Sequence, residues 1–216
     1  MLTVICGPMF SGKTAELIRL VRRDRIGGRK VQLFKFAHDA RYADVNTMAS
    51  LDGMKLEAIP VSHSSDVVKH LDRSCNDVVI DEVQFFDDGI IDVVRALIDR
   101  GVWVKVAGLT LDFRGVAFPF ASGERSMSDL LVSADRIIQL NAVCTAMKDV
   151  DRVCGNTASR TQRLIDGKPA AYDSAIQTIG STELYEARCV KHHEVPGRPV
   201  CPVTLEQQKL ELVRSL

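Results

Sequence analysis

A glycine-rich stretch near the start of the chain has the residue types and spacing needed to bind phosphate groups. It reads Gly-Pro-Met-Phe-Ser-Gly-Lys-Thr and matches G-x-x-x-x-G-K-[ST] at every fixed position. Glycines let the backbone turn tightly and direct its N–H groups at an anion. Lys13 can neutralise the β- and γ-phosphates, and the Thr14 hydroxyl can ligate Mg²⁺. The predicted ATP contacts of this loop are Gly7, Pro8, Met9, Phe10, Ser11, Gly12, Lys13 and Thr14.

An acidic pair at Asp81 and Glu82 follows an apolar run, Val78 to Ile80. A strand that ends in a carboxylate is typical of the second half of a phosphate site, where Asp81 would hold Mg²⁺ through its water shell. Glu82 is one residue further along and can face a substrate. A carboxylate there can accept a proton from an attacking hydroxyl group or water. The pair therefore predicts phosphoryl transfer to an acceptor.

Aromatic residues follow another apolar run, which extends from 102 to 109. Phe113 and Phe118 lie just beyond the expected end of this strand, where α/β proteins bind ligands. Their rings could form the walls of a pocket for a planar base. The polar loop 37–53 can lie over the same strand ends, and Arg41 within it is a candidate phosphate contact.

Cysteine and histidine residues in the last third of the chain have the composition of a metal site. Cys144 and Cys154 form one pair, and Cys189 and His192 form a second pair spaced C-x₂-H. Two such pairs about 35 residues apart suggest a tetrahedral structural Zn²⁺. The first pair is spaced C-x₉-C, which is wider than the usual C-x₂₋₄-C. Buried free cysteines are the alternative interpretation.

The elements that must position these residues follow a β-α-β order, which favours a parallel α/β sheet. Apolar and β-branched runs predict strands, and amphipathic stretches predict helices. Arg136 to Leu140 is expected as a last core strand, and a capping box at 204–207 begins a final helix. We divide the chain into a core (1–140), a metal-binding domain (141–195) and a tail (196–216). The expected strands are 2–6, 31–36, 78–82, 102–109 and 136–140, and the expected helices are 15–26, 65–71, 90–99 and 127–134.

Composition limits the class of protein. The chain has 216 residues, 46% of them hydrophobic, which is enough for a proper core. The formal net charge is zero, so no electrostatic argument favours nucleic acid or a membrane surface as partner. There is no long apolar run and no signal-peptide pattern, so we expect a cytoplasmic protein. The six cysteines are then thiols or metal ligands rather than disulfides.

Taken together, these motifs resemble the type II thymidine kinases, the cellular and bacterial class. The resemblance rests on the phosphate loop, on Asp-Glu-Val-Gln-Phe-Phe from residue 81, and on Gly-Leu-Thr-Leu-Asp-Phe-Arg-Gly from residue 108. Thr-Gln-Arg-Leu at 161–164, Ile-Gly at 179–180 and Tyr-Glu-Ala-Arg-Cys at 185–189 also contribute. It extends from residue 1 to about residue 197.

The resemblance implies a RecA-like α/β core with a phosphate loop and a small zinc-bound domain that carries a lasso loop over the nucleoside. It implies a homotetramer that uses ATP and Mg²⁺ to phosphorylate the 5′-hydroxyl of thymidine, and also deoxyuridine, with Glu82 as the base. Beyond the loop, the implied ATP and Mg²⁺ contacts are Asp39, Arg41, Asp81, Gln84 and Arg163. The implied nucleoside contacts are Met9, Leu109, Phe113, Phe118, Thr161, Ile176, Gln177, Thr178, Ile179, Gly180 and Tyr185. The implied zinc ligands are Cys144, Cys154, Cys189 and His192.

Two other classes of P-loop protein remain as alternatives. Asp112-x-x-Gly115 suggests a GTPase, but the guanine-reading Asn-Lys-x-Asp is absent. Asp-Glu-Val-Gln suggests a nucleic-acid motor ATPase, but the chain lacks room for a second motor domain and lacks a basic track. The alternative function is thus a P-loop ATPase or GTPase of nucleic-acid metabolism.

Overall fold

The larger part of the molecule is a six-stranded parallel sheet in the order β5-β2-β6-β7-β1-β8. We describe it from a computed structural model, which describes residues 1–37, 47–49, 53–176 and 185–200. The strands are β1 (Leu2–Gly7), β2 (Val31–Phe36), β5 (Ile59–Val61), β6 (Asp77–Asp81), β7 (Trp103–Leu109) and β8 (Arg136–Gln139).

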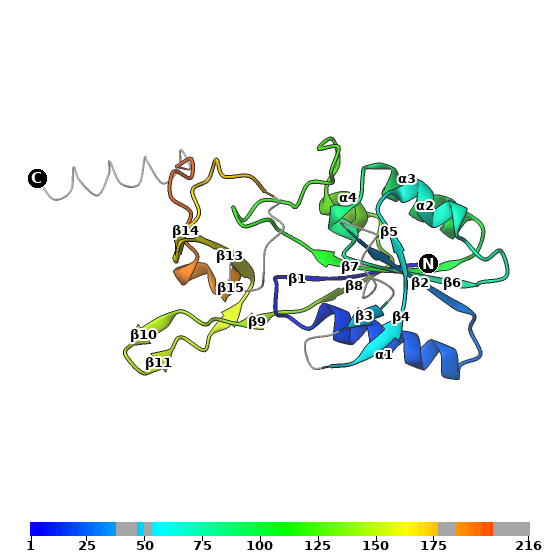
Figure 1. Ribbon diagram of the computed structural model, residues 1–216, viewed down its shortest axis with the longest axis horizontal. Helices are drawn as coiled ribbons and strands as arrows, with labels where there is room; N and C mark the ends of the chain where they lie inside the picture. Colours follow the sequence, from blue (N-terminus) through cyan, green and yellow to red (C-terminus); the bar gives the residue numbers. More distant parts are fainter. Residues whose placement is uncertain (38–46, 50–52, 177–184, 201–216) are drawn as a thin grey trace, which may run out of the picture.

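Helices cover both faces of this sheet (Figure 1). Helix α1 (Lys13–Ile26) packs Leu17, Ile18, Leu20 and Val21 against one face. The other face is covered by α2 (Ser64–Lys69), α3 (Gly89–Asp99) and α4 (Met127–Val132). Because both faces are buried, strands such as β1 are apolar along their whole length rather than alternating. This arrangement confirms the predicted α/β core.

Two of the predicted elements are wrong in detail. Strand β8 is at the edge of the sheet and pairs only with β1, and Ile137 is 51% exposed, so β8 is not the core strand that its apolar residues predicted. The loop 37–53 was expected to be irregular throughout. Its residues Thr47–Ala49 instead form β3, which pairs with β4 (Lys55–Glu57) because Met48 is buried beneath α1. The predicted tail helix lies outside the described residues.

A small domain follows β8 and consists of short strands. Two of them, β9 (Ala142–Val143) and β12 (Thr157–Ala158), pair with each other, and the three-stranded sheet β14-β13-β15 lies beside them. Its strands are β13 (Arg160–Ile165), β14 (Lys168–Pro169) and β15 (Tyr185–Arg188), and the single turn η4 (Val190–His192) follows. Among the described residues of this domain, the hydrophobic cluster consists of alanine and cysteine side chains, so packing alone stabilises it weakly.

The carboxyl ends of the parallel strands place the candidate functional residues on one edge of the sheet. Strand β7 lies between β1 and β6 and pairs with both, and Gly7 is directly opposite Leu109. The phosphate loop after β1, the acidic pair after β6 and the aromatic segment after β7 therefore leave the sheet next to one another. Figure 1 shows the small domain beyond this edge, on the side away from the amino terminus.

Candidate functional site

The phosphate loop joins β1 to α1 and has a backbone that only certain residues allow. A Cβ on Gly7 would lie 2.3 Å from the carbonyl oxygen of Leu140, so a side chain is sterically excluded there. Gly12 has φ +81°, in the left-handed region, and the helix begins at the next residue. The first N–H groups of a helix have no partner within the helix, and here they border the loop. The loop can therefore bind an anion through its backbone.

Lys13 supplies the positive charge of this loop. Its Nζ donates to the carbonyl oxygen of Pro8 at 2.7 Å, so the ammonium group lies against its own loop. Burial lowers the pKa of Lys13, and the negative charges of Glu82 and Asp81 act in the opposite direction. The ammonium group is thus placed where phosphate oxygens would lie.

Asp81 and Thr14 form the candidate Mg²⁺ site. The Thr14 hydroxyl donates to Asp81 Oδ2 at 3.2 Å, and the amide of Glu82 donates to Asp81 Oδ1 at 3.0 Å. Burial, together with the neighbouring charge of Glu82, raises the pKa of Asp81 to about 7. A buried carboxylate beside a hydroxyl offers the hard oxygen ligands that Mg²⁺ prefers. These residues therefore fit the cation, and its charge would favour ionised Asp81.

Glu82 has a strained backbone and a tightly held side chain. Its φ of 54° is in the left-handed region, which a non-glycine residue adopts at a cost. Gln84, in the turn η2 (Val83–Phe85), donates from Nε2 to Glu82 Oε2 at 2.6 Å. The other amide atom of Gln84, Oε1, accepts from the amide of Leu109 at 3.0 Å. The side chain of Gln84 therefore fixes the Glu82 carboxylate against the end of β7.

Gln84 is fully buried, and the close approach of Gly108 makes room for it. A Cβ on Gly108 would lie 2.6 Å from Gln84 Oε1. Sequence reasoning placed Gln84 among the nucleotide contacts and missed this arrangement. A glycine inside a buried strand, next to the acidic pair in the sheet, was the signal that could have indicated it.

The predicted nucleoside residues from several segments meet in the structure. Met9, Leu109, Phe118 and Ile176 belong to or pack against the same hydrophobic cluster, and the rings of Phe85 and Phe118 meet edge to face at 5.8 Å between centroids. Phe113 is also buried, and the centroid of its ring lies 5.6 Å from the guanidinium carbon of Arg163.

Strand β13 brings the small domain to the phosphate loop. The Thr161 hydroxyl accepts a hydrogen bond from the amide of Met9 at 3.0 Å. Arg163, predicted as a phosphate contact, is buried, and its Nη1 donates to the carbonyl oxygen of Ala175. Tyr185 is directly opposite Arg163 in the pairing of β13 with β15. Asp39, Arg41, Gln177, Thr178, Ile179 and Gly180 lie outside the described residues.

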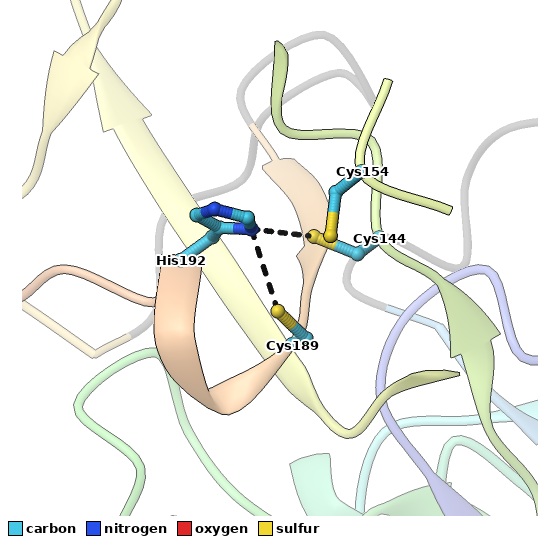
Figure 2. Close-up of side chains that lie close together, drawn as sticks. All are labelled: Cys144, Cys154, Cys189 and His192. Carbon is cyan, nitrogen blue, oxygen red and sulfur yellow. Dashed lines mark hydrogen bonds between the residues drawn. The ribbon is translucent and has the colours of Figure 1, made fainter. Parts of the chain in front are cut away.

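The four predicted metal ligands converge in the small domain (Figure 2). One ligand atom from each of Cys144, Cys154, Cys189 and His192 lies within 4.8 Å of all the others. His192 Nδ1 is 3.6 Å from the sulfur of Cys144 and 3.4 Å from that of Cys189. A tetrahedral zinc ion with ordinary Zn–S and Zn–N bonds requires about 3.5 Å between such atoms. The chemistry of these ligands and their convergence therefore fit a tetrahedral Zn²⁺ site.

The wide spacing of Cys144 and Cys154 has a simple structural explanation. Between them the chain forms a hairpin of β10 (Met147–Asp149) and β11 (Arg152–Val153). Cys154 N donates to Ala146 O at 2.7 Å, so the hairpin closes at its base and returns the second cysteine to the first. The extra residues form an arm and leave the cluster geometry intact.

A family model described as thymidine kinase matches residues 1–193. The matched region includes the phosphate loop, the acidic pair, the aromatic segment and all four cluster residues.

Among the residues that the structure describes, no helix has the length and apolar character needed to cross a membrane.

Proposed function

Because the chain belongs to the thymidine kinase family and is a kinase, we propose that it transfers the γ-phosphoryl group of ATP to the 5′-hydroxyl of thymidine. The products are dTMP and ADP, and deoxyuridine is a second acceptor. The observation that carries this proposal is the position of Glu82. Its carboxylate is held beside the Thr14–Asp81 pair and next to the segment that begins at Leu109.

The proposed chemistry is an in-line displacement. The 5′-oxygen forms a bond to the γ-phosphorus, and the bond from that phosphorus to the leaving oxygen of ADP breaks. Glu82 accepts the proton of the 5′-hydroxyl, and Gln84 keeps the Glu82 carboxylate in place. Lys13 and the first amides of α1 neutralise phosphate charge. When bound by Thr14 and Asp81, Mg²⁺ supplies further neutralisation of phosphate charge.

The nucleoside is proposed to lie against the apolar wall of Met9, Leu109, Phe113 and Phe118. Thr161, residues 176–180 and Tyr185 are the proposed contacts from the lasso segment. Their support is that the described members of this set lie on the loop, on β13, on β15 and against the shared hydrophobic cluster.

Zinc is proposed to have a structural role. Its four ligands come from both ends of the small domain and would tie β9 to η4, and β13 with Thr161 lies between them. The division into a core (1–140), a zinc-bound lasso domain (141–195) and a tail (196–216) remains part of this proposal. A homotetramer is proposed on the family resemblance alone, and a cytoplasmic location is proposed on the sequence pattern described above.

A nucleoside screen tests the proposed function. ATP consumption is measured with thymidine, deoxyuridine and the other nucleosides, with single-stranded DNA, and with GTP in place of ATP. We expect turnover with thymidine and deoxyuridine. Turnover that requires DNA, or that proceeds with GTP and no acceptor, would instead indicate a motor ATPase or a GTPase.

A matched pair of variants tests the base. Glu82→Gln should retain its fold and its affinity for thymidine but lose about 10²- to 10⁴-fold in kcat, because an amide cannot accept the proton. Glu124→Gln, at an exposed position, is the control and should be unchanged. Near wild-type turnover in Glu82→Gln would contradict the assignment of the base.

A further inference from the structure

His193 is not among the zinc-cluster residues or the predicted nucleoside contacts, yet it touches both regions. It directly follows His192 at the end of η4. Its Nε2 lies 2.8 Å from the carbonyl oxygen of Phe113, 80 residues away in the chain. The ring is half-buried, and Gln162, the neighbour of Thr161 in β13, holds the residue that follows His193. His193 and the residue after it therefore contact two segments that carry proposed nucleoside contacts.

The support beneath His193 is rigid on both sides. The preceding residue is a member of the Cys/His cluster. The following residue, Glu194, is held by the side chain of Gln162: Gln162 Nε2 donates to the carbonyl oxygen of Glu194 at 2.8 Å, and the amide of Glu194 donates to Gln162 Oε1 at 2.9 Å. Gln162 is itself buried in β13. The backbone on both sides of His193 is therefore held in place, by the cluster before it and by this double hydrogen bond after it.

Phe113 is held by the same domain at a second point. The guanidinium group of Arg163 lies over its ring, 5.6 Å from the centroid, and Nη1 of Arg163 binds the carbonyl oxygen of Ala175. Ala175 precedes Ile176, the first proposed contact of the lasso segment. The backbone of Phe113 is thus hydrogen-bonded to His193, and its ring contacts Arg163. Arg163 also binds the backbone just before the lasso segment.

We propose that His193 is a positioning residue for the nucleoside: by donating from Nε2 to the carbonyl oxygen of Phe113, it sets the distance between this pocket wall and the small domain. The proposal rests on the proposed function, because Phe113 is assigned to the nucleoside pocket there. In this proposal the zinc-bound domain has two roles. It carries the lasso segment, and it holds Phe113 of the core in position. His193 acts through Phe113 and does not take part in phosphoryl transfer.

Two substitutions at this position separate the hydrogen bond from the volume of the ring. His193→Gln keeps a donor at nearly the same distance from the backbone as Nε2, whereas His193→Leu fills the space without a donor. Lys191→Ala, at an exposed position of η4, is the matched control. For each protein, zinc content, the thymidine dissociation constant by calorimetry, KM for thymidine, KM for ATP, and kcat are measured.

We expect His193→Leu to weaken thymidine about tenfold, in both the dissociation constant and KM. This is the effect of losing one hydrogen bond and leaving a buried carbonyl unpaired. KM for ATP and kcat should stay within about twofold, because neither the phosphate loop nor Glu82 is touched. His193→Gln should recover thymidine binding to within about twofold of the wild type, and zinc content should be the same in all four proteins.

Three results would overturn the proposal. They are unchanged thymidine affinity in His193→Leu, an equal weakening of thymidine and ATP, and loss of zinc from that variant, since the last two would mark His193 as part of the general framework. Failure of the proposed function is recognised separately, because the wild-type protein would then neither bind nor phosphorylate thymidine.

Discussion

Two lysines in this molecule lie near buried carboxylates, and their partners differ. Lys105 Nζ in β7 is 2.6 Å from Asp77 Oδ2 and 2.9 Å from Asp24 Oδ2, and all three side chains are almost completely buried. Lys13 Nζ is 2.7 Å from a carbonyl oxygen of its own loop. Within the part of the chain that the structure describes, no carboxylate lies within ion-pairing distance of Lys13.

This difference distinguishes a structural charge group from a functional one. Burying a charge is costly unless it is paired. The buried ammonium group of Lys105 is paired with two carboxylates, and we call Lys105, Asp24 and Asp77 the closed group. At the phosphate loop, Lys13, Asp81 and Glu82 are assembled, but their charges are not neutralised by one another at close range. Lys105 and Arg23 hold the pKa of Asp24 below its usual value against the effect of burial, although burial raises the pKa of Asp77 in the same cluster. At the phosphate loop, burial and the charge of Glu82 raise the pKa of Asp81 to about 7. We therefore expect bound phosphate to neutralise Lys13, whereas Lys105 is already paired.

Removing the functional lysine should have the largest effect. Lys13→Met is expected to lower kcat/KM for ATP at least about 10³-fold, because phosphate charge in the transition state would lose its main cation. The melting temperature should be unchanged or higher, since an unpaired ammonium group leaves a partly buried position. Steady-state kinetics and thermal unfolding measure the two quantities. A loss of activity smaller than tenfold would contradict the proposal that Lys13 neutralises phosphate charge.

The same substitution at the structural lysine should have the opposite pattern. Lys105→Met leaves Asp77 and Asp24 buried without a cation, so we expect the free energy of unfolding to fall by about 3–4 kcal/mol. kcat/KM at 25 °C should stay within about twofold of the wild type. Urea unfolding measures the stability, and Lys69→Met, which breaks an exposed pair with Asp66, is the control and should change it little. Wild-type stability in Lys105→Met would show that the closed group is not needed.

Sequence patterns predicted that Lys13, Asp81 and Glu82 would lie together, but they did not predict the cluster of Lys105, Asp24 and Asp77. The phosphate loop, Asp81 and Glu82 have fixed spacing, because a bound phosphate imposes the same local geometry wherever it occurs. Asp24, Asp77 and Lys105 have no such spacing, and they meet only because α1, β6 and β7 pack together. For the same reason, the hydrogen bonds of Gln84 and His193 were missed: each depends on a register or a domain contact that no local pattern contains.

The four zinc-cluster residues are an intermediate case. The C-x₂-H half follows from local geometry, since η4 directly places Cys189 and His192 on one side of a turn. The C-x₉-C half could not be assigned from spacing. Only the β10–β11 hairpin explains why Cys144 and Cys154 meet. The edge position of β8 was missed because its apolar residues gave the same pattern as a central strand.

Gln84 allows a further test, because it is a neutral side chain that binds the Glu82 carboxylate. Gln84→Met should lower kcat about tenfold while KM for thymidine stays within about twofold, since Glu82 would lose the donor that orients it. Gln32→Met is the control: Gln32 also uses both amide atoms, to the backbone of His70 and Asp72, but at an exposed site. Equal effects on kcat and KM would indicate that Gln84 supports the fold rather than the orientation of Glu82.

The cluster of Lys105, Asp24 and Asp77 should also show a pH dependence of its own. Because the pKa of Asp24 is lowered in the folded protein, ionised Asp24 stabilises the fold fully above the ordinary aspartate pKa of about 3.9. This stabilisation is lost as the pH falls through the lowered value. Asp24→Asn should therefore be less stable than the wild type by about 2 kcal/mol at pH 6, and the difference should shrink as the pH falls through the lowered pKa of Asp24.

Urea unfolding of both proteins between pH 6 and pH 2.5 measures this difference, and other acid effects cancel because both proteins share them. Asp66→Asn, whose partner Lys69 is exposed, should give a much smaller difference at every pH. A difference between wild type and Asp24→Asn that grew on acidification would mean that burial, and not Lys105, controls Asp24. The structural group would then be as incompletely neutralised as the one at the phosphate loop.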